Sequence, residues 1–176
     1  MLKKILVGLG GILVVLAAVV AMQPAQFEVV RKAKVNGPPE KVFGMVNDFH
    51  KWRAWSPWEK LDPAMKRTYS GAESGTGAMY GWVGNNDVGE GRMTITESMP
   101  HQIVRIKLEF IKPFAATNST EFRFTPAENQ TEVVWRMTGE NNFMSKAFCL
   151  VMGGMDKMIG PDFEKGLAQM QAAAAM

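Results

Sequence analysis

Seven stretches typical of β-strands are the feature that most constrains the fold of this chain of 176 residues. Six of them follow one another at intervals of about ten residues, and clusters of Gly, Asn, Asp and Pro separate them. This spacing indicates antiparallel strands joined by short turns rather than by crossover helices. The predicted strands cover residues 27–35, 66–69, 78–83, 91–98, 103–110, 115–126 and 131–139.

The later strands alternate between apolar and polar side chains. Val104, Ile106 and Leu108, for example, are separated by Arg105 and Lys107. Such alternation predicts a sheet with one apolar face and one solvated face. The residues expected on the apolar face of these strands are Val104, Ile106, Leu108, Phe110, Phe122, Phe124, Val133, Trp135 and Met137.

Helical spacing of apolar residues occurs on both sides of this strand series. Residues 40–49 are expected to form a helix with one apolar face, and residues 50–65 a short helical or irregular stretch. Residues 143–175 have apolar steps of three and four, which predict one long amphipathic helix. Gly153-Gly154 and Pro161 favour a bend in it, which would leave two helical segments. We predict an α+β fold whose last helix covers the apolar face of the sheet.

An unbroken apolar run, residues 5–22, follows Lys3 and Lys4 at the amino terminus. As a helix, these residues would reach roughly 27 Å, close to the hydrocarbon thickness of a bilayer. The run exceeds the apolar core of an ordinary signal peptide, although small residues near Ala21 would allow cleavage there. A buried helix of a soluble fold is the third possibility, but no polar face interrupts the run.

We therefore expect a single-pass membrane protein with a domain behind the anchor. Residues 1–4 would be a cytoplasmic leader, 5–22 a transmembrane signal anchor, 23–26 a linker and 27–175 one ligand-binding domain. Lys3 and Lys4 favour the cytoplasmic side for the amino terminus, which places the domain outside the cytoplasm. Basic residues behind the run, between positions 31 and 41, argue against this orientation.

Composition argues against several function classes. The net charge of +3 includes Lys3 and Lys4, so the domain is nearly neutral and has no basic stripe for nucleic acid. Cys149 is the only cysteine, and His50 and His101 lie far apart in the sequence. We therefore expect no intrachain disulfide, no metal site and no cofactor, and hydrolase chemistry is disfavoured. The oligomeric state stays open.

Local motifs resemble those of the START/Bet v 1-like (SRPBCC) superfamily. Residues 39–43 (Pro-Glu-Lys-Val-Phe) open the first helix, and residues 47–52 and 55–58 carry Asn-Asp-Phe-His-Lys-Trp and Trp-Ser-Pro-Trp. Residues 66–81, with Tyr-Ser-Gly and Gly-Thr-Gly, resemble the next hairpin of the polyketide cyclase/dehydrase-like branch. The resemblance covers residues 27–172 and implies a helix-grip fold, in which a curved sheet encloses the last helix. Since these motifs are structural, they point to fold more strongly than to ligand.

The resemblance also implies a cavity between sheet and helix that accepts apolar small molecules or lipids. The residues expected to line it are Trp52, Trp55, Trp82, Met93, Ile95, Val104, Ile106, Leu108, Phe122, Phe124, Trp135, Met152, Met155 and Ile159. Flexible methionines suit variable apolar ligands, but they also fill dry cores. Trp52, Trp55 and Trp58 would line the cavity mouth, enter the bilayer interface, or clamp the first helices onto the sheet.

Few residues offer chemistry to such a cavity. Glu97 is expected near a strand end with its side chain inward, where burial would raise its pKa and suit it to acid–base work. Tyr80 and His50 are the other weak catalytic candidates, and Asn118 and Thr120 share the inward face. A carboxylate at such a position is more often a polar rim group. Cys149 is expected to be an inert packed thiol.

The sequence thus favours a membrane-tethered domain that binds a lipid or other apolar small molecule. Two alternatives stay open. One is a polyketide cyclase/dehydrase-like enzyme that uses an inward carboxylate, and the other is a protein-interaction module at the membrane.

Overall fold

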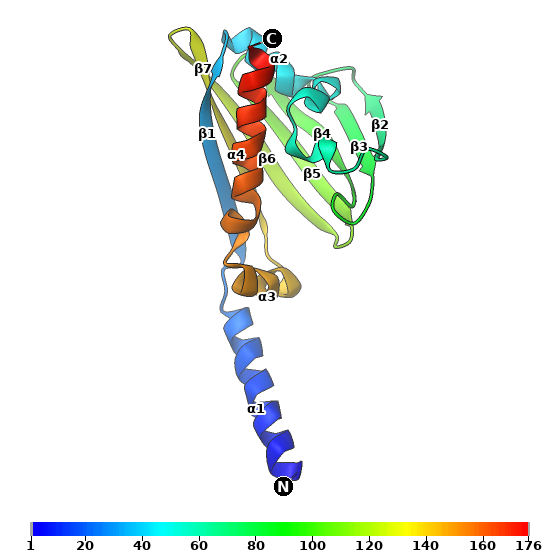
Figure 1. The fold of residues 1–176 in the computed structure, drawn as a ribbon, viewed down its shortest axis with the longest axis vertical. Coiled ribbons are helices and arrows are strands. Elements are labelled where there is room, and N and C mark those ends of the chain that lie inside the picture. Colours follow the sequence, from blue (N-terminus) through cyan, green and yellow to red (C-terminus); the bar gives the residue numbers. More distant parts are fainter. Residues whose placement is uncertain (1, 176) are drawn as a thin grey trace.

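A computed structural model describes residues 2–175, and the side chains of residues 8–175. Its elements are α1 (Leu2–Ala21), β1 (Gln26–Asn36), α2 (Pro39–Asn47), the 3₁₀ helices η1 (Phe49–Ala54) and η2 (Pro57–Lys60), β2 (Lys66–Gly71), β3 (Ala78–Val83), β4 (Glu90–Met99), β5 (Ile103–Lys112), β6 (Ala116–Ala127), β7 (Gln130–Glu140), α3 (Phe143–Met152) and α4 (Met155–Ala174) (Figure 1).

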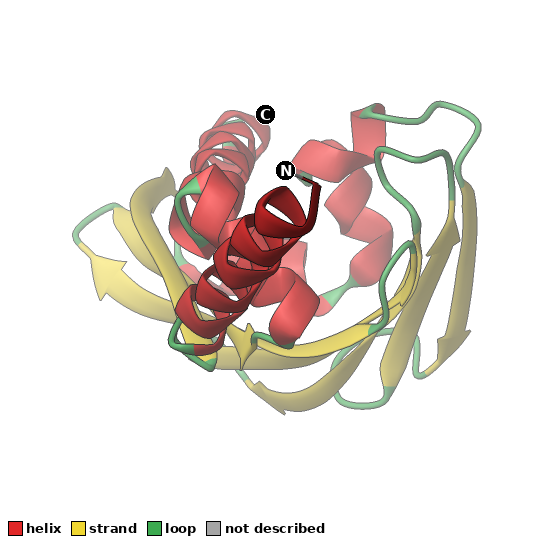
Figure 2. Cartoon of the chain, turned by 90° about the horizontal axis from the view of Figure 1, so that it is seen from below, coloured by secondary structure: helices red, strands yellow, loops and turns green. Residues whose placement is uncertain are grey.

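The strands form one seven-stranded antiparallel sheet in the order β1-β7-β6-β5-β4-β3-β2. The sheet curves around the helices of the domain, as Figure 2 shows from below. The prediction of an α+β fold of the helix-grip type is therefore confirmed. The third predicted strand, residues 78–83, has the bounds seen in the structure, and the bounds of the others differ by one or two residues at an end.

The apolar face predicted for the sheet is its concave, helix-covered face. Val104 and Ile106 of β5 are fully buried, and so is Phe122 of β6, which pairs with Val104 on one side and Trp135 on the other. On the convex face, Arg105 bonds the carboxylates of Glu121 and Glu97. The alternation in the sequence thus separates core from solvent as expected.

The first domain helix, α2, starts at Pro39 and buries Val42, Phe43 and Val46 on the sheet. It ends at Asn47, two residues before the predicted end, because Asp48 is extended with φ −120° and ψ 110°. The Asp48 carboxylate accepts a hydrogen bond from the backbone N–H of His50 at 2.9 Å and so caps η1.

The C-terminal segment forms two helices, α3 and α4, separated at Gly153 and Gly154. Both glycines have positive φ, at 83° and 101°, a conformation that side chains disfavour and that ends α3. At its other end, the Asn142 carboxamide oxygen accepts a hydrogen bond from the N–H of Ser145 at 2.8 Å. Pro161 lies inside α4 without ending it, so the break comes from the glycine pair alone.

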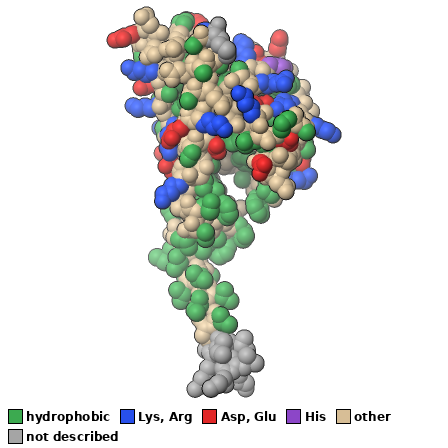
Figure 3. Space-filling model, viewed as in Figure 1, with side chains coloured by type: hydrophobic (Ala, Val, Ile, Leu, Met, Phe, Trp, Pro, Cys, Tyr) green, Lys and Arg blue, Asp and Glu red, His purple; other side chains and the backbone are tan. Residues whose placement is uncertain are grey.

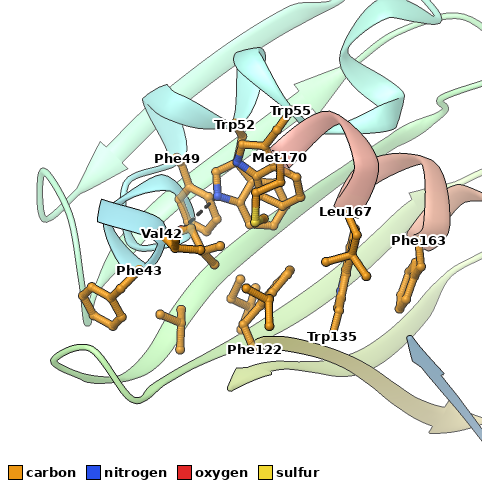
Figure 4. Packing of buried hydrophobic residues seen from close by; sticks show 14 of the residues in the cluster. Val42, Phe43, Phe49, Trp52, Trp55, Phe122, Trp135, Phe163, Leu167 and Met170 are labelled. Carbon is orange, nitrogen blue, oxygen red and sulfur yellow. Dashed lines mark hydrogen bonds between the residues drawn. The ribbon is translucent and has the colours of Figure 1, made fainter. Parts of the chain in front are cut away.

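Of these two helices, only α4 covers the sheet, where it lies along β1 (Figure 1). Arg31 of β1 holds the first half of α4 by ion pairs with Asp156 and Glu164, both at 2.7 Å. Further along, Phe163, Leu167 and Met170 enter the core that Figure 4 shows. Gly166 permits the close approach, because a Cβ there would lie 2.8 Å from the Trp135 ring.

Helix α1 extends away from the domain (Figure 1). Large apolar side chains at positions 9, 12–16 and 22 are exposed. Over the residues that the structure describes, no helix combines the length and apolar character required to cross a membrane. The expected span, residues 5–22, begins among residues whose side chains lie outside the described part, and it stays a prediction.

Candidate functional site

An apolar cavity of about 200 Å³ lies between the concave face of the sheet and the helices. Strands β3 to β7 form its floor, and η1, η2 and α4 cover it, so residues far apart in sequence share one wall. Its lining consists of Trp52, Ser56, Trp58, Glu59, Met65, Tyr80, Trp82, Asp87, Val88, Met93, Leu108, Phe110, Thr120, Trp135, Met137, Ile159, Asp162 and Phe163.

Stacked aromatic rings build the wall where α4 meets the sheet. Phe163 of α4 stacks on Trp135 with centroids 3.9 Å apart, and Phe122 packs on the other side of the indole at 4.8 Å. Trp58 of η2 meets Trp135 edge-on at 5.9 Å. Rings held on both faces do not reorient easily, so this wall is preformed for apolar ligands.

Methionines form a softer part of the lining. Met65 precedes β2, Met93 belongs to β4 and Met137 to β7. Because a thioether chain has several rotatable bonds, it adapts to ligands of different shape. The aromatic part of the cavity lining is therefore rigid, and the methionine part is adaptable.

A buried polar cluster of Glu59, Tyr80 and Arg67 touches the cavity at η2. The Tyr80 hydroxyl donates to Glu59 Oε1 at 2.7 Å, and Arg67 Nε donates to Oε2 at 2.7 Å. Arg67 also bonds the backbone carbonyl of Glu59 at 3.1 Å. A buried carboxylate requires such partners, because it is costly to desolvate alone. The cluster holds η2 against β2 and β3.

Tyr80 is held in its protonated form. Burial, followed by the hydrogen bond to Glu59, keeps the pKa of its hydroxyl well above the usual range. Both carboxylate oxygens of Glu59 already accept hydrogen bonds. Because Tyr80 keeps its proton and Arg67 compensates the charge of Glu59, the arrangement favours a positioning role.

The fourteen residues predicted to line the cavity have four different outcomes. Six do line it, namely Trp52, Trp82, Met93, Leu108, Trp135 and Ile159. Another six are buried in the adjoining core without lining it, namely Trp55, Ile95, Val104, Ile106, Phe122 and Phe124. Met155 is partly buried against that core. The prediction that Met152 lines the cavity is wrong, because Met152 lies on α3 before the glycine break and is 50% exposed.

The tryptophan cluster of Trp52, Trp55 and Trp58 contributes to the cavity wall and attaches the first helices to one another, and it does not form an exposed patch. Trp52 donates its indole N–H to the Val46 carbonyl, and Trp55 donates to that of Met45, both at 2.9 Å. These bonds fasten the η1 segment to α2, and Figure 4 shows Trp52 and Trp55 among the buried side chains. Trp52 and Trp58 also line the cavity.

Of the catalytic candidates, only Tyr80 reaches the cavity. Glu97 is predicted to point inward, but it pairs with Arg105 on the convex side of the sheet. A register irregularity in β4 between Ile95 and Glu97 accounts for this, since it turns Glu97 away from the face of Ile95. His50 is exposed, bonded to Asp48 and stacked on Tyr69. Thr120 lines the cavity, whereas Asn118 lines a separate surface groove near the start of β6.

Sequence reasoning missed Glu59 and Arg67. Glu59 lies in a four-residue 3₁₀ helix, where no periodicity distinguishes inside from outside. Its partners become visible only when η2 packs on β2 and β3. Within the described residues, no cluster of three or more His, Cys, Asp or Glu side chains is arranged to hold a metal ion.

Comparison with known families agrees with this geometry. The sequence profile of the family described as polyketide cyclase/dehydrase and lipid transport matches residues 26–175. The chain belongs to this family. The part of the resemblance that concerned the polyketide cyclase/dehydrase branch is thereby confirmed. No curated protein matches the chain in sequence.

Solved structures share the fold of this polyketide cyclase/dehydrase family domain at low identity. A protein from Chromobacterium violaceum is 12% identical with a TM-score of 0.62, over 85% of this chain and 97% of that one. A protein from Thermus thermophilus is 15% identical with a TM-score of 0.61, over 85% and 97%. The di-domain ARO/CYC StfQ from the steffimycin biosynthetic pathway is 11% identical with a TM-score of 0.62, over 86% of this chain and 51% of its own. At these identities the likeness shows the fold alone.

Proposed function

We propose that this domain binds a lipid or other apolar small molecule in its cavity, and that residues 5–22 hold it at a membrane. The cavity carries the proposal, since aromatic and methionine side chains enclose about 200 Å³ and few polar groups face it. Small-molecule sites are typically concave and apolar, with a small number of placed polar groups. The family's description, which includes lipid transport, also supports a lipid or other apolar molecule as the ligand.

The size of the cavity limits the ligand. A dry cavity of roughly 150 Å³ accepts benzene in other proteins. A volume of about 200 Å³ therefore suits one ring system or the end of an acyl chain, with the rest of a larger ligand outside. Rotation of Met93 or Met137 would enlarge the site for bulkier ligands.

The membrane part of the proposal rests on the sequence and on α1. Residues 5–22 are uniformly apolar, and exposed side chains such as Leu13, Val14 and Val15 have no cover from the domain. Apolar surface of this extent is costly in water. With Lys3 and Lys4 on the cytoplasmic side, the domain would lie outside the cytoplasm.

The cyclase/dehydrase-like alternative has less support. It relied on an inward carboxylate, and Glu97 is paired on the other face of the sheet. Three carboxylates line the cavity: both oxygens of Glu59 accept hydrogen bonds from Arg67 and Tyr80, Asp87 is exposed to solvent, and Asp162 is part-exposed.

Ligand extraction tests the proposal directly. The full chain would be purified in mild detergent and examined by native mass spectrometry, with extraction of bound small molecules. We expect a co-purifying apolar molecule, lost in Leu108→Trp, which fills the cavity, and retained in Met79→Trp, which adds the same group to an exposed side of β3. Absence of a ligand from wild type after expression in several hosts, or equal ligand content in the two variants, would overturn the proposal.

A further inference from the structure

Helix α3 presents an apolar stripe to solvent. Met144, Phe148, Val151 and Met152, at helical positions i, i+4, i+7 and i+8, are between 50% and 83% exposed. This is the spacing by which a helix normally buries one face. None of the residues of α3 is buried, although both its ends are properly capped. The helix is thus well formed while its apolar face covers nothing within the described chain.

A second exposed apolar group lies at the same end of the domain. Residues 111–115, which form the end of β5 and the β5–β6 turn, are all exposed, and Phe114 is 70% exposed. The strand register places this turn at the same end of the sheet as α3. Near this end, Asn118 of β6 pairs with Gly139 of β7, just before α3, and Gln26 of β1 pairs with Glu140.

Helix α1 enters the domain at this end too. Lys146 of α3 donates a hydrogen bond to the carbonyl of Ala21, the last residue of α1, at 3.2 Å. Figure 3 shows hydrophobic side chains covering the stalk and the adjoining end of the domain, whereas charged side chains are spread over the rest of this face. The exposed surface of α3 is therefore continuous with the apolar surface of α1, and the β5–β6 turn lies at the same end of the domain. The exposed surfaces of α3 and of this turn are together called the basal surface here.

We propose that the basal surface, residues 111–114 and 143–152, docks on the lipid bilayer that receives α1, with α3 lying in the plane of the interface. The inference rests on the anchor in the proposed function, because α1 fixes which end of the domain meets the lipid. Helices that lie in the plane of a membrane interface bury their apolar face about 5–10 Å into the boundary between headgroups and acyl chains. Lys146 is the single charged residue of α3.

Docking at this surface determines which side of the cavity meets the membrane. Val88 and Phe110 line the cavity and lie near the β3–β4 and β5–β6 turns, and Ile159 lines it from the first half of α4. These three are part-exposed, whereas Trp52 and Tyr80 deeper in the cavity are buried. The part of the cavity rim that these three residues form thus faces the docked membrane. The ligand would be a component of that bilayer, which enters without crossing water.

Site-specific labelling of the full chain tests the docking. In a Cys149→Ala background, single cysteines would replace Val15 in α1, Val151 in α3 and Glu128 in the β6–β7 turn at the opposite end of the sheet. Each would carry an environment-sensitive nitrobenzoxadiazole label in vesicles of phosphatidylcholine and phosphatidylglycerol, with quenchers on the headgroup or deep on the acyl chain. We expect the deep quencher to act most strongly at position 15, the shallow one at position 151, and neither at position 128.

The outcomes separate docking from anchoring. Quenching at position 15 with no quenching at position 151 would overturn the docking and leave the anchor and cavity intact. A label at position 151 that is shielded from water but not quenched by lipid would also overturn it, because a protein partner then covers α3. No quenching at position 15 would overturn the anchor and the docking together, while ligand extraction would still test the cavity.

A paired substitution checks the stripe itself. Met144→Glu with Phe148→Glu should abolish quenching at position 151 and leave quenching at position 15 unchanged. Both side chains are exposed, so the thermal midpoint in detergent should stay that of the labelled parent. Retained quenching at position 151 would mean that the stripe does not hold α3 at the bilayer and would overturn the proposal.

Discussion

The ring of Phe163 lies parallel to the indole of Trp135, with centroids 3.9 Å apart and 9° between the planes. This stack joins α4 to β7 at the cavity wall, and Gly166 lets the two elements approach. The same contact thus secures the C-terminal helix and shapes the site. Loss of this stack should have a larger effect on the stability of the domain than on its ligand selectivity.

Replacing Phe163 by Ala should destabilise the domain strongly. The ring is almost fully buried, and large-to-small changes of buried aromatic residues cost about 3–5 kcal/mol. Denaturant unfolding of the full chain in detergent would measure the loss. Phe148→Ala on α3 is the matched control, since that ring is 56% exposed and its removal should change the free energy of unfolding by less than about 0.5 kcal/mol. Equal losses in the two variants would contradict the assignment of core and surface.

The two α4 glycines near the sheet should respond differently to alanine. Alanine favours a helix over glycine by about 1 kcal/mol, whereas overpacking costs about 1–3 kcal/mol. At Gly166, the new Cβ would meet the Trp135 ring at 2.8 Å, and stacked rings prevent that indole from moving. We expect Gly166→Ala to lower stability.

At Gly160, the added Cβ would instead meet the guanidinium end of Arg31. That flexible side chain can swing aside, and exposed ion pairs contribute little. Gly160→Ala should therefore be close to neutral by thermal melting. A larger loss at Gly160 than at Gly166 would show that the Arg31 ion pairs matter more than the aromatic stack.

Removing the Tyr80 hydroxyl should weaken the attachment of η2. In Tyr80→Phe, one buried oxygen of Glu59 loses its donor, which costs about 1–3 kcal/mol. Denaturant unfolding at neutral pH would measure this loss. Tyr69→Phe is a suitable control, since the Tyr69 hydroxyl has no hydrogen-bond partner within the described residues. Equal loss in both variants would argue against a specific role of the bond to Glu59.

Tyr80→Phe should also change how the stability of the domain depends on pH above pH 10. The pKa of Tyr80 is raised in the folded state, so its contribution is complete below the ordinary pKa of 10.0 and declines as the pH rises above it. Unfolding measured above pH 10 should show a smaller further loss in Tyr80→Phe than in wild type. Parallel curves would mean that Tyr80 ionises as freely in the folded chain as in the unfolded one.

Acid should remove a stabilising contribution of Glu109. Hydrogen bonds from Arg92 and Lys107 lower the pKa of its carboxyl from 4.5 to about 2. Because the folded-state pKa is the lower one, the contribution is present above pH 4.5 and is lost as the pH falls toward 2. Wild type should therefore lose more stability across this window than Glu109→Gln. A constant difference between the two unfolding curves would contradict the assignment.

Local pattern in the sequence accounts for most of the fold. The strand at residues 78–83 and the buried face of α2 were predicted correctly, because alternation and helical spacing record which side of an element meets the core. The antiparallel order followed from short turns between successive strands. The break between α3 and α4 was visible as Gly153-Gly154, although its consequence for Met152 was not.

The cavity, by contrast, was decided by tertiary structure. Ile106 and Leu108 lie on one face of the same strand, yet Ile106 is packed in the core while Leu108 lines the cavity. Periodicity assigns both to the apolar face but cannot say where a curved sheet separates from its covering helices. The meeting of Glu59, Arg67 and Tyr80 has the same origin, since η2 reaches those strands only through packing. Sequence alone determined which side chains of the regular strands face inward, because alternation follows local backbone geometry, and it failed at Glu97, where the register of β4 shifts. Which of them enclose empty space depends on the distance between layers, and only the folded chain sets that distance.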